Sequence, residues 1–231
     1  MTAFTTIKEY DDFIVIDKSP GINFHTEEGI PGIFEQVKFA IACEDLHPVH
    51  RLDKITSGLL IFAKSQAAAS ELSEQFRLRQ VSKFYLAISD KKPKKKQGLI
   101  KGDMEKTRRG GWKLCKSQTN PAITQFFSHS IKPGLRLFLL KPRTGKTHQI
   151  RVALKSIGAP VVGDGLYNDA WAASKADRGY LHAYALSFTL RGKKYHFIAP
   201  PQQGELFRNE ETRRLIEDKF STPEALAWPR I

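Results

Sequence analysis

The chain has 231 residues, which suits one compact domain or two lobes that share a sheet and is enough to bury a substantial core. Hydrophobic residues make up 41% and charged residues 26%, as in ordinary globular proteins, and no run approaches the ~18 apolar residues of a membrane span. The formal net charge of +13 favours a polyanionic partner, most commonly nucleic acid, although a ribosome-associated protein or an acidic-lipid binder fits the charge equally well.

Neither the N-terminus nor the cysteines indicate export. Residues 1–13 are polar and acidic and lack the charged-then-apolar pattern of a secretory signal, so we expect mature, cytoplasmic sequence. Cys43 and Cys115 form no CxxC pair, and the seven histidines show no HExxH or other metal-binding spacing. We therefore expect two inert thiols in a reducing compartment and no metal site.

The first elements alternate strand and helix. Phe13–Asp17 is predicted to be a buried strand that ends in the turn Lys18–Gly21, and Ile33–Ala42 is predicted to be a short helix. Gly58–Ala63 is a second apolar strand.

A helix and a third strand follow. Ser65 is predicted to cap a helix that continues to about Arg79 with Leu72 and Phe76 facing inward. Phe84–Ile88 is the strand after it.

The apolar pattern lapses between residues 91 and 111. This stretch is rich in Lys, Gly and Arg and is predicted to be an exposed excursion, either a solvated loop or a segment that contacts phosphates. Its basic residues include Lys91, Lys92, Lys94, Lys95, Lys96, Arg108 and Arg109.

A hairpin and a helix come next. Ile123–Ser128 and Leu135–Leu140 are predicted to pair across Pro133-Gly134, which fits a type II turn. A helix is predicted from about Thr147, with Gly158 as its C-terminal stop.

The last elements are a second hairpin and a charged helix. Leu181–Leu190 and Lys194–Ala199 are predicted to pair around Arg191-Gly192, and Gly204–Phe220 to be helical. Strands and helices mixed in this way predict an α+β fold, with a mixed, largely antiparallel sheet flanked by helices.

Polar residues before the strand Gly58–Ala63 are the first candidates for chemistry. The segment HRLDKITSGLL (residues 50–60) can place its charged side chains in a cleft while the strand holds them rigidly. Asp53 could be a nucleophile, a general base, a metal ligand or a structural loop cap. The local pattern alone favours the cap, because Asp is common in turns.

A second segment is RTGKTHQIRVAL (residues 143–154). Its TGKT suggests a Walker A loop, but Leu140 stands where that motif needs a glycine, so we reject an NTPase. On a helical wheel, Arg151 flanks the apolar stripe, Thr147 lies on the same side and His148 points to the opposite face. Arg151 either reaches a cleft or packs its stem on the core with its charge in solvent.

A third segment is KFYLAI (residues 83–88). Alternation places Phe84 and Tyr85 on opposite faces of a strand. Tyr85 either stacks on an unpaired base in a groove or is buried with its hydroxyl satisfied, and this stretch alone somewhat favours burial.

Together these segments resemble the RluA family of pseudouridine synthases. HRLDKITSGLLIFAKS, KFYLAI, GKTHQIRVAL followed by GAPVVGDGLY, and LHAYALSF are similar, in this order, to four family signatures. The resemblance extends from about Phe13 to Pro200. It implies a pseudouridine synthase fold with a central catalytic cleft, residues 1–231 as one catalytic domain of two lobes that share a sheet, and a monomer. We expect no S4-like or other separate RNA-binding domain.

The resemblance also implies roles for individual residues. Asp53 is similar to the essential aspartate, Tyr85 to the tyrosine that stacks on the target base, and Arg151 to the arginine paired with the catalytic carboxylate. Arg51 is similar to an arginine that enters the RNA stack. RNA contacts are expected from Arg51, His50, Lys54, Thr147 and His148, and Thr56, Ser57 and Gly58 are expected to shape the loop.

Three positions depart from the family pattern. Ile55 replaces a frequent acidic residue, Lys146 a common arginine and Ala153 a common histidine. These positions flank the chemistry, so they affect the fit to RNA more than the reaction.

The implied reaction converts uridine in ribosomal or transfer RNA to pseudouridine and needs no cofactor or metal. An ionised Asp53, with Arg151 as counter-charge, could attack the sugar, add to the uracil ring or remove the C2′ proton, and the sequence does not choose among these. One alternative is a non-catalytic RNA-binding or ribosome-assembly module. A more distant alternative is a metal-dependent nuclease that uses Asp53, Asp164 and histidines.

Overall fold

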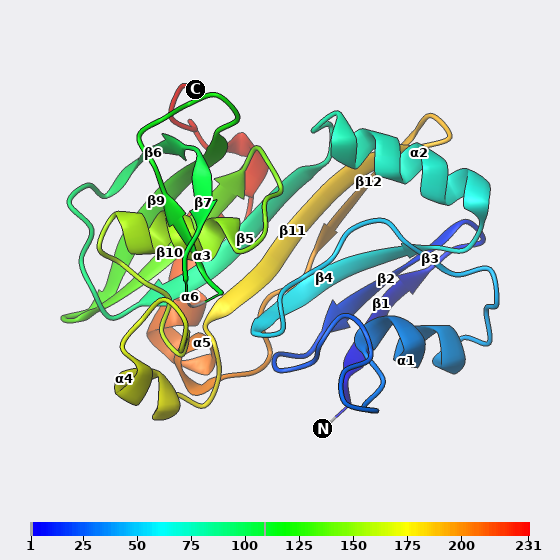
Figure 1. Cartoon of the computed structure of the whole chain (residues 1–231), viewed down its shortest axis with the longest axis horizontal. Coiled ribbons are helices and arrows are strands. Elements are labelled where there is room, and N and C mark those ends of the chain that lie inside the picture. Colours follow the sequence, from blue (N-terminus) through cyan, green and yellow to red (C-terminus); the bar gives the residue numbers. More distant parts are fainter. Residues whose placement is uncertain (1, 109) are drawn as a thin grey trace. The chain divides into compact units, whose positions relative to one another are not determined.

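The computed structural model describes residues 2–108 and 110–231, which fall into two compact units (Figure 1). Unit 1 comprises residues 2–83 and 182–201, and unit 2 comprises the described residues of 84–181 together with 202–231. Helices combined with a large, mostly antiparallel sheet confirm the predicted α+β class. Within the described residues, no helix is both long enough and apolar enough to cross a membrane.

Unit 1 has the strand order β1–β2–β4–β11, with β12 paired to β11 and the short β3 to β4. Its strands are β1 (Phe4–Glu9), β2 (Phe13–Lys18), β3 (His47–Pro48), β4 (Thr56–Ala63), β11 (Leu181–Leu190) and β12 (Lys193–Ile198). Its helices are α1 (Ile33–Ala40) and α2 (Gln66–Arg77). The predicted strands and helices of this unit are confirmed, although α1 and α2 each end two residues earlier than predicted, before left-handed Ala42 and Arg79. Strand β1, whose side chains are mostly exposed, has no apolar pattern that would predict it.

Strand β4 is buried at every position because both of its faces are covered. On one face, Leu59 belongs to the same core cluster as Leu72 of α2. On the other face, the Phe62 ring lies 6.0 Å from that of Phe24 and 5.8 Å from that of Phe34 in α1. Burial on two faces explains why this strand is a continuous apolar run rather than an alternating one.

Two predicted local signals of unit 1 are confirmed. The Ser65 hydroxyl accepts a hydrogen bond from Ala68 N at 3.2 Å and so caps α2. Arg191 and Gly192 both have positive φ angles, 50° and 74°, as a two-residue turn between β11 and β12 requires.

Unit 2 has the strand order β5–β10–β9–β6 and a separate two-stranded sheet, β7–β8. Its strands are β5 (Ser82–Ser89), β6 (Gln97–Gly102), β7 (Met104–Lys106), β8 (Trp112–Leu114), β9 (Ala122–Lys132) and β10 (Leu135–Pro142). Its helices are α3 (Gln149–Ser156), α4 (Ala170–Ser174), α5 (Glu205–Arg208), α6 (Glu210–Phe220) and the 3₁₀ turn η1 (Pro223–Ala225). The β9–β10 hairpin is confirmed, with Gly134 at a φ of 76°.

The predicted excursion between residues 91 and 111 is partly wrong, since it contains two strands. Only Ile100 and Gly102 of β6 are buried, which explains why the apolar pattern did not predict this strand. Its backbone hydrogen bonds to β9 stabilise it instead. The lysines of segment 91–96 are exposed, as predicted. Arg109 lies outside the described residues.

Two predicted helices differ at their ends. Helix α3 begins at Gln149 rather than Thr147, because His148 has a φ of 57° and cannot belong to a right-handed helix. The predicted helix Gly204–Phe220 is two helices, because Asn209 has an extended ψ of 137° and its side chain caps α6.

Candidate active site

Asp53 lies in the segment that connects β3 to β4 in unit 1. The neighbouring Leu52 is only 5% exposed and anchors this segment in the core, whereas Arg51 and Lys54 are exposed and Asp53 is half-buried. The Asp53 carbonyl accepts a hydrogen bond from Thr56 N at 3.0 Å, which forms the turn into β4. The carboxylate thus stands at a partly accessible position on a fixed backbone.

A fully buried lysine, the last residue of β2, supports this segment. Lys18 Nζ donates to the carbonyls of Ser19 at 2.9 Å and Ile22 at 2.8 Å, and to that of Lys54 at 3.4 Å. Gly21 N donates to the same Lys54 carbonyl at 2.8 Å. Because a buried ammonium group needs acceptors around it, these bonds hold the two turns together. The sequence predicts only a turn at Lys18. A lysine at the end of an apolar strand is the feature of the sequence that could have indicated a buried, supporting role.

The first residues of β4 are held against β11. Buried Ser57 Oγ lies 2.7 Å from His182 Nδ1, and His182 Nε2 lies 2.7 Å from the Ala199 carbonyl. Since a carbonyl can only accept, Nε2 donates to Ala199, and Nδ1 shares the second hydrogen bond of the ring with the Ser57 hydroxyl. Gly58 has a φ of 107°, and a Cβ there would lie 2.3 Å from the Ala183 carbonyl oxygen, so only glycine fits. Sequence reasoning about local pattern gave His182 no role, since it lies 125 residues from Ser57.

The His50 ring is part of the packing of unit 1. Its Nε2 accepts a hydrogen bond from Ile61 N at 3.0 Å, and the ring stacks on Phe76 with centroids 4.6 Å apart. Burial of the ring, followed by the charge of Lys83, lowers the pKa of His50 to about 3. His50 is therefore neutral at physiological pH, and its contact with RNA stays a prediction.

The lowered pKa of His50 predicts a loss of stability on acidification. The unfolded chain takes up a proton near the ordinary value of 6.5, whereas the folded chain does so only near 3. Between these values the unfolded state binds more protons, so the free energy of unfolding falls as pH falls. Urea titrations at about pH 7 and about pH 5 should show a smaller loss for His50→Gln than for the unsubstituted protein. Equal losses would contradict this assignment.

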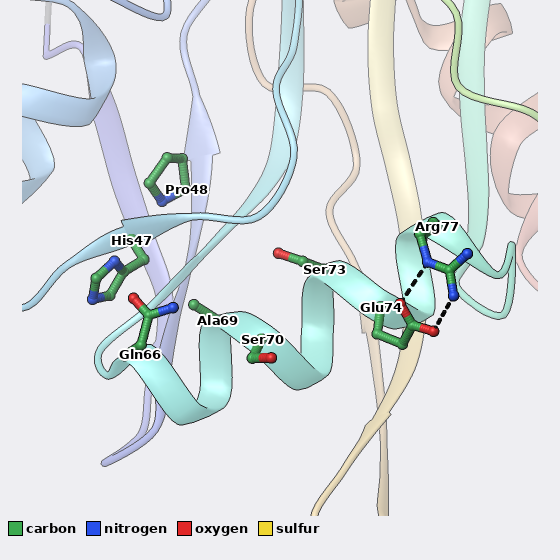
Figure 2. Close-up of a pocket in the computed structure, with 8 residues that line it drawn as sticks. All are labelled: His47, Pro48, Gln66, Ala69, Ser70, Ser73, Glu74 and Arg77. Carbon is green, nitrogen blue, oxygen red and sulfur yellow. Dashed lines mark hydrogen bonds and ion pairs between the residues drawn. The ribbon is translucent and has the colours of Figure 1, made fainter.

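A groove of about 530 Å³ lies beside α2 in the same unit (Figure 2). Its lining is mostly polar: His47, Pro48, Gln66, Ala69, Ser70, Ser73, Glu74 and Arg77. Glu74 and Arg77 pair with each other at one end of α2. None of the residues predicted from the sequence to act on the substrate lines this groove.

Unit 2 positions Arg151 with a carboxylate of its own. Arg151 lies on α3 and is 6% exposed. Its Nε and Nη2 donate to the two carboxylate oxygens of fully buried Asp164 at 2.7 and 2.8 Å. Asp164 also accepts from the backbone amides of Leu166 and Tyr167, at 3.1 and 3.3 Å. A bidentate, buried pair of this kind fixes the plane of the guanidinium group.

Tyr167 connects Arg151 to His148. The Arg151 guanidinium lies 5.0 Å from the centre of the Tyr167 ring, and His148 Nδ1 lies 3.0 Å from the Tyr167 hydroxyl. The predicted placement of His148 on the face opposite Arg151 is therefore wrong. Residues three apart lie on the same side of a helix, so the wheel itself gives His148 and Arg151 neighbouring positions, and His148 moreover precedes α3 in a left-handed conformation. The same hydroxyl accepts from Trp112 N at 2.9 Å.

The remaining residues predicted for the site also lie in unit 2. Tyr85 on β5 is half-buried between fully buried Phe84 and Leu86, and it pairs in register with Leu140 of β10. Thr147 is exposed in the turn before α3. Of the two aromatic residues predicted to lie on opposite faces of this strand, Phe84 is therefore the one that packs in the core.

The predicted site residues therefore form two sets. His50, Arg51, Asp53 and Lys54 belong to unit 1, and Tyr85, Thr147, His148 and Arg151 belong to unit 2. Sequence reasoning missed Lys18, His182 and the role of Asp164. Over residues 2–108 and 110–231, no three His, Cys, Asp or Glu side chains converge as metal ligands would.

Comparisons with known proteins agree with the resemblance in the sequence. A family model described as RNA pseudouridylate synthase matches residues 12–156. An uncharacterized RNA pseudouridine synthase of Haemophilus influenzae is 49% identical over 201 residues, which is 87% of this chain and 89% of that protein.

A second relative and a solved structure extend this agreement. The dual-specificity RNA pseudouridine synthase RluA of Escherichia coli K12 is 32% identical over 202 residues, or 82% of this chain and 90% of that protein. The structure of human RNA pseudouridylate synthase domain containing 1 superposes with a TM-score of 0.73 at 25% identity and covers 86% of this chain and 83% of its own. On these matches over most of its length, the chain belongs to the RNA pseudouridine synthases, a family of isomerases that act on RNA, and is of the RluA type.

Proposed function

We propose that this enzyme isomerises one or more specific uridines in structured ribosomal or transfer RNA and uses Asp53 as the catalytic carboxylate. The observation that carries the proposal is the placement of Asp53. Its side chain is half-buried on a segment held by hydrogen bonds from Lys18, Gly21 and Thr56. The Asp53 carbonyl accepts the hydrogen bond that forms the turn into β4, and the alternative of an aspartate that only caps this turn is tested by the rate of Asp53→Asn.

The reaction breaks the N1–C1′ glycosidic bond, rotates the uracil and joins C5 to C1′. No oxidation or external group is involved, so the chemistry requires neither a cofactor nor a metal. The ionised Asp53 would attack C1′, add to the uracil ring or accept the C2′ proton. The target base must leave its stack, which costs a few kcal/mol unless it already lies in a loop.

We propose roles in this reaction for residues of unit 2 as well. Arg151, oriented by Asp164, would serve as the counter-charge for the catalytic carboxylate. Tyr85 would stack on the target base. Exposed Arg51 of unit 1 would occupy the position in the RNA stack that the flipped base leaves. Thr147, His148 and Lys54 would contact the RNA backbone.

The proposal also covers the cellular compartment and the oligomeric state of the enzyme. We place it in the cytoplasm as a monomer, with units 1 and 2 acting as one catalytic domain. Cys43 and Cys115 are both free thiols, which agrees with a reducing compartment. The dual-specificity name of the Escherichia coli relative supports more than one target RNA.

Tritium release tests the proposed chemistry directly. RNA that carries 5-tritiated uridine loses its label only when C5 becomes bonded to C1′. Transfer and ribosomal RNA from a strain that lacks the gene should release tritium with the purified enzyme, and pseudouridine mapping should locate the sites. Tight RNA binding without tritium release would instead identify a non-catalytic RNA-binding or ribosome-assembly module.

Substitution of Tyr85 should separate stacking from hydroxyl chemistry. Tyr85→Phe keeps the ring, so we expect RNA affinity within about twofold of the unsubstituted enzyme. Tyr85→Ala removes the stacking surface and should weaken binding by about tenfold or more, since base–aromatic stacking is worth about 1–3 kcal/mol. Filter binding measures both. Equal affinity of the two variants would contradict the stacking role.

A further inference from the structure

A large aromatic side chain is exposed on a short helix of unit 2. Trp171 lies on α4 and is 73% exposed, and none of the residues of α4 is buried. The helix is ordered by its own hydrogen bonds: Asp169 Oδ1 accepts from Ala172 N at 2.8 Å, and Ser174 Oγ donates to the Trp171 carbonyl at 2.8 Å. Packing of the core therefore does not account for a tryptophan here.

A cation accompanies the exposed ring. Lys175 Nζ lies 5.6 Å from the centre of the Trp171 ring. The two acidic groups nearest in sequence are engaged elsewhere, since Asp169 caps α4 and Asp177 accepts from Tyr180 Oη and from Glu205 N. An aromatic face beside a positive charge combines the two interactions that hold unpaired nucleotides, stacking on the base and attraction to phosphate.

The Trp171–Lys175 pair is connected to Arg151 by a chain of hydrogen bonds. Asn168 N donates to the Asp164 carbonyl at 2.9 Å, and Asp169 N donates to Asn168 Oδ1 at 2.9 Å. Asn168 Nδ2 also donates to the Val161 carbonyl at 3.2 Å. Asp164 is the residue that holds Arg151. The helix that carries Trp171 is therefore placed by the same turn that orients the arginine.

We propose that Trp171 and Lys175 form a substrate-recognition site that stacks on an unpaired base of the RNA next to the target uridine and contacts its phosphate. The proposal deepens the proposed function and rests on RNA as the substrate. RNA is favoured over a protein partner because the chain carries a net charge of +13, the enzymes of its family act on RNA, and a lysine accompanies the ring. The pair would help to determine which loop the enzyme accepts.

Steady-state kinetics on 5-tritiated transfer and ribosomal RNA from the gene-deleted strain test the role in recognition. Trp171→Ala should raise KM by about tenfold with little change in kcat, and Trp171→Phe should stay within about threefold. Lys175→Ala should raise KM by about two- to fivefold, with Lys175→Arg close to the unsubstituted enzyme. Because α4 contributes no buried residue, all four variants should keep the same Tm.

Phe39→Ala is the matched control. Phe39 is 89% exposed on α1 of unit 1, and neighbouring Lys38 pairs with Glu44 at 3.0 Å. This control should leave KM unchanged. A KM for Trp171→Ala within twofold of the unsubstituted value, or an equal rise for Phe39→Ala, would overturn the proposal.

A binding measurement that does not need turnover separates this proposal from the proposed function. In an Asp53→Asn background, a single-stranded oligouridine should quench tryptophan fluorescence, and Trp171→Phe should remove most of that quenching. A fully paired RNA duplex should quench much less. If quenching is the same with and without Trp171, the recognition site is wrong even where tritium is released. If tritium is not released by the unsubstituted enzyme, the catalytic proposal fails while the quenching result stands.

Discussion

Asp53→Asn is expected to abolish tritium release while RNA binding is retained. Asparagine has nearly the same shape as aspartate, and the hydrogen bond that forms the turn uses the backbone carbonyl of residue 53, so the fold should be unchanged. The amide is neither a nucleophile nor a base. We expect a fall in the single-turnover rate of about 10²–10⁴-fold or more, the range for loss of a positioned proton-transfer group. RNA affinity should stay equal or rise slightly, because a negative charge that faces a polyanion is removed.

A matched substitution guards against a general effect of changing charge. Asp45 is an exposed aspartate of unit 1 that pairs with His47 at 2.6 Å. Asp45→Asn should leave both the rate and the affinity unchanged. Normal pseudouridine yield from Asp53→Asn would refute Asp53 as the catalytic group, whatever the behaviour of the control.

Asp164→Asn is expected to cause the largest loss of stability. It removes the carboxylate that pairs with the buried Arg151 guanidinium, and breaking one side of a buried ion pair typically costs about 3–5 kcal/mol. Urea titration should show this loss as a lower midpoint with a similar slope. The exposed pair of Glu74 and Arg77 provides the control, and Glu74→Gln should not change stability measurably.

A double substitution separates the structural role of the pair from its catalytic role. Arg151→Met with Asp164→Asn removes both charges and keeps a side-chain oxygen for the amides of Leu166 and Tyr167, so it should recover much of the stability lost by Asp164→Asn alone, because no unpaired charge stays buried. Activity should not return, since no guanidinium is then available beside the substrate. Recovery of normal tritium release in the double variant would show that Arg151 has only a structural role.

Much of the fold follows from local patterns that need no tertiary information. The apolar runs at Phe13–Asp17 and Gly58–Ala63 become strands because only burial stabilises them, and both are buried along nearly their whole length. The Ser65 cap and the turn at Gly134 depend on chemistry within a few residues. Asp53 was likewise identified from its own segment, together with the resemblance of that segment to a family signature.

Only the tertiary structure decided which partners each of these residues has. Lys18 reaches Lys54 across 36 residues, and Ser57 reaches His182 across 125, so no sequence window contains either pair. Asp164 is the partner of Arg151 across 13 residues, and His148 and Arg151 both contact Tyr167, which lies 19 residues from His148. Strand β6 formed in a polar stretch because β9 supplied hydrogen bonds. Sequence by itself determined the elements and the catalytic candidate, since these depend on neighbours along the chain, whereas the supporting contacts depend on neighbours in space.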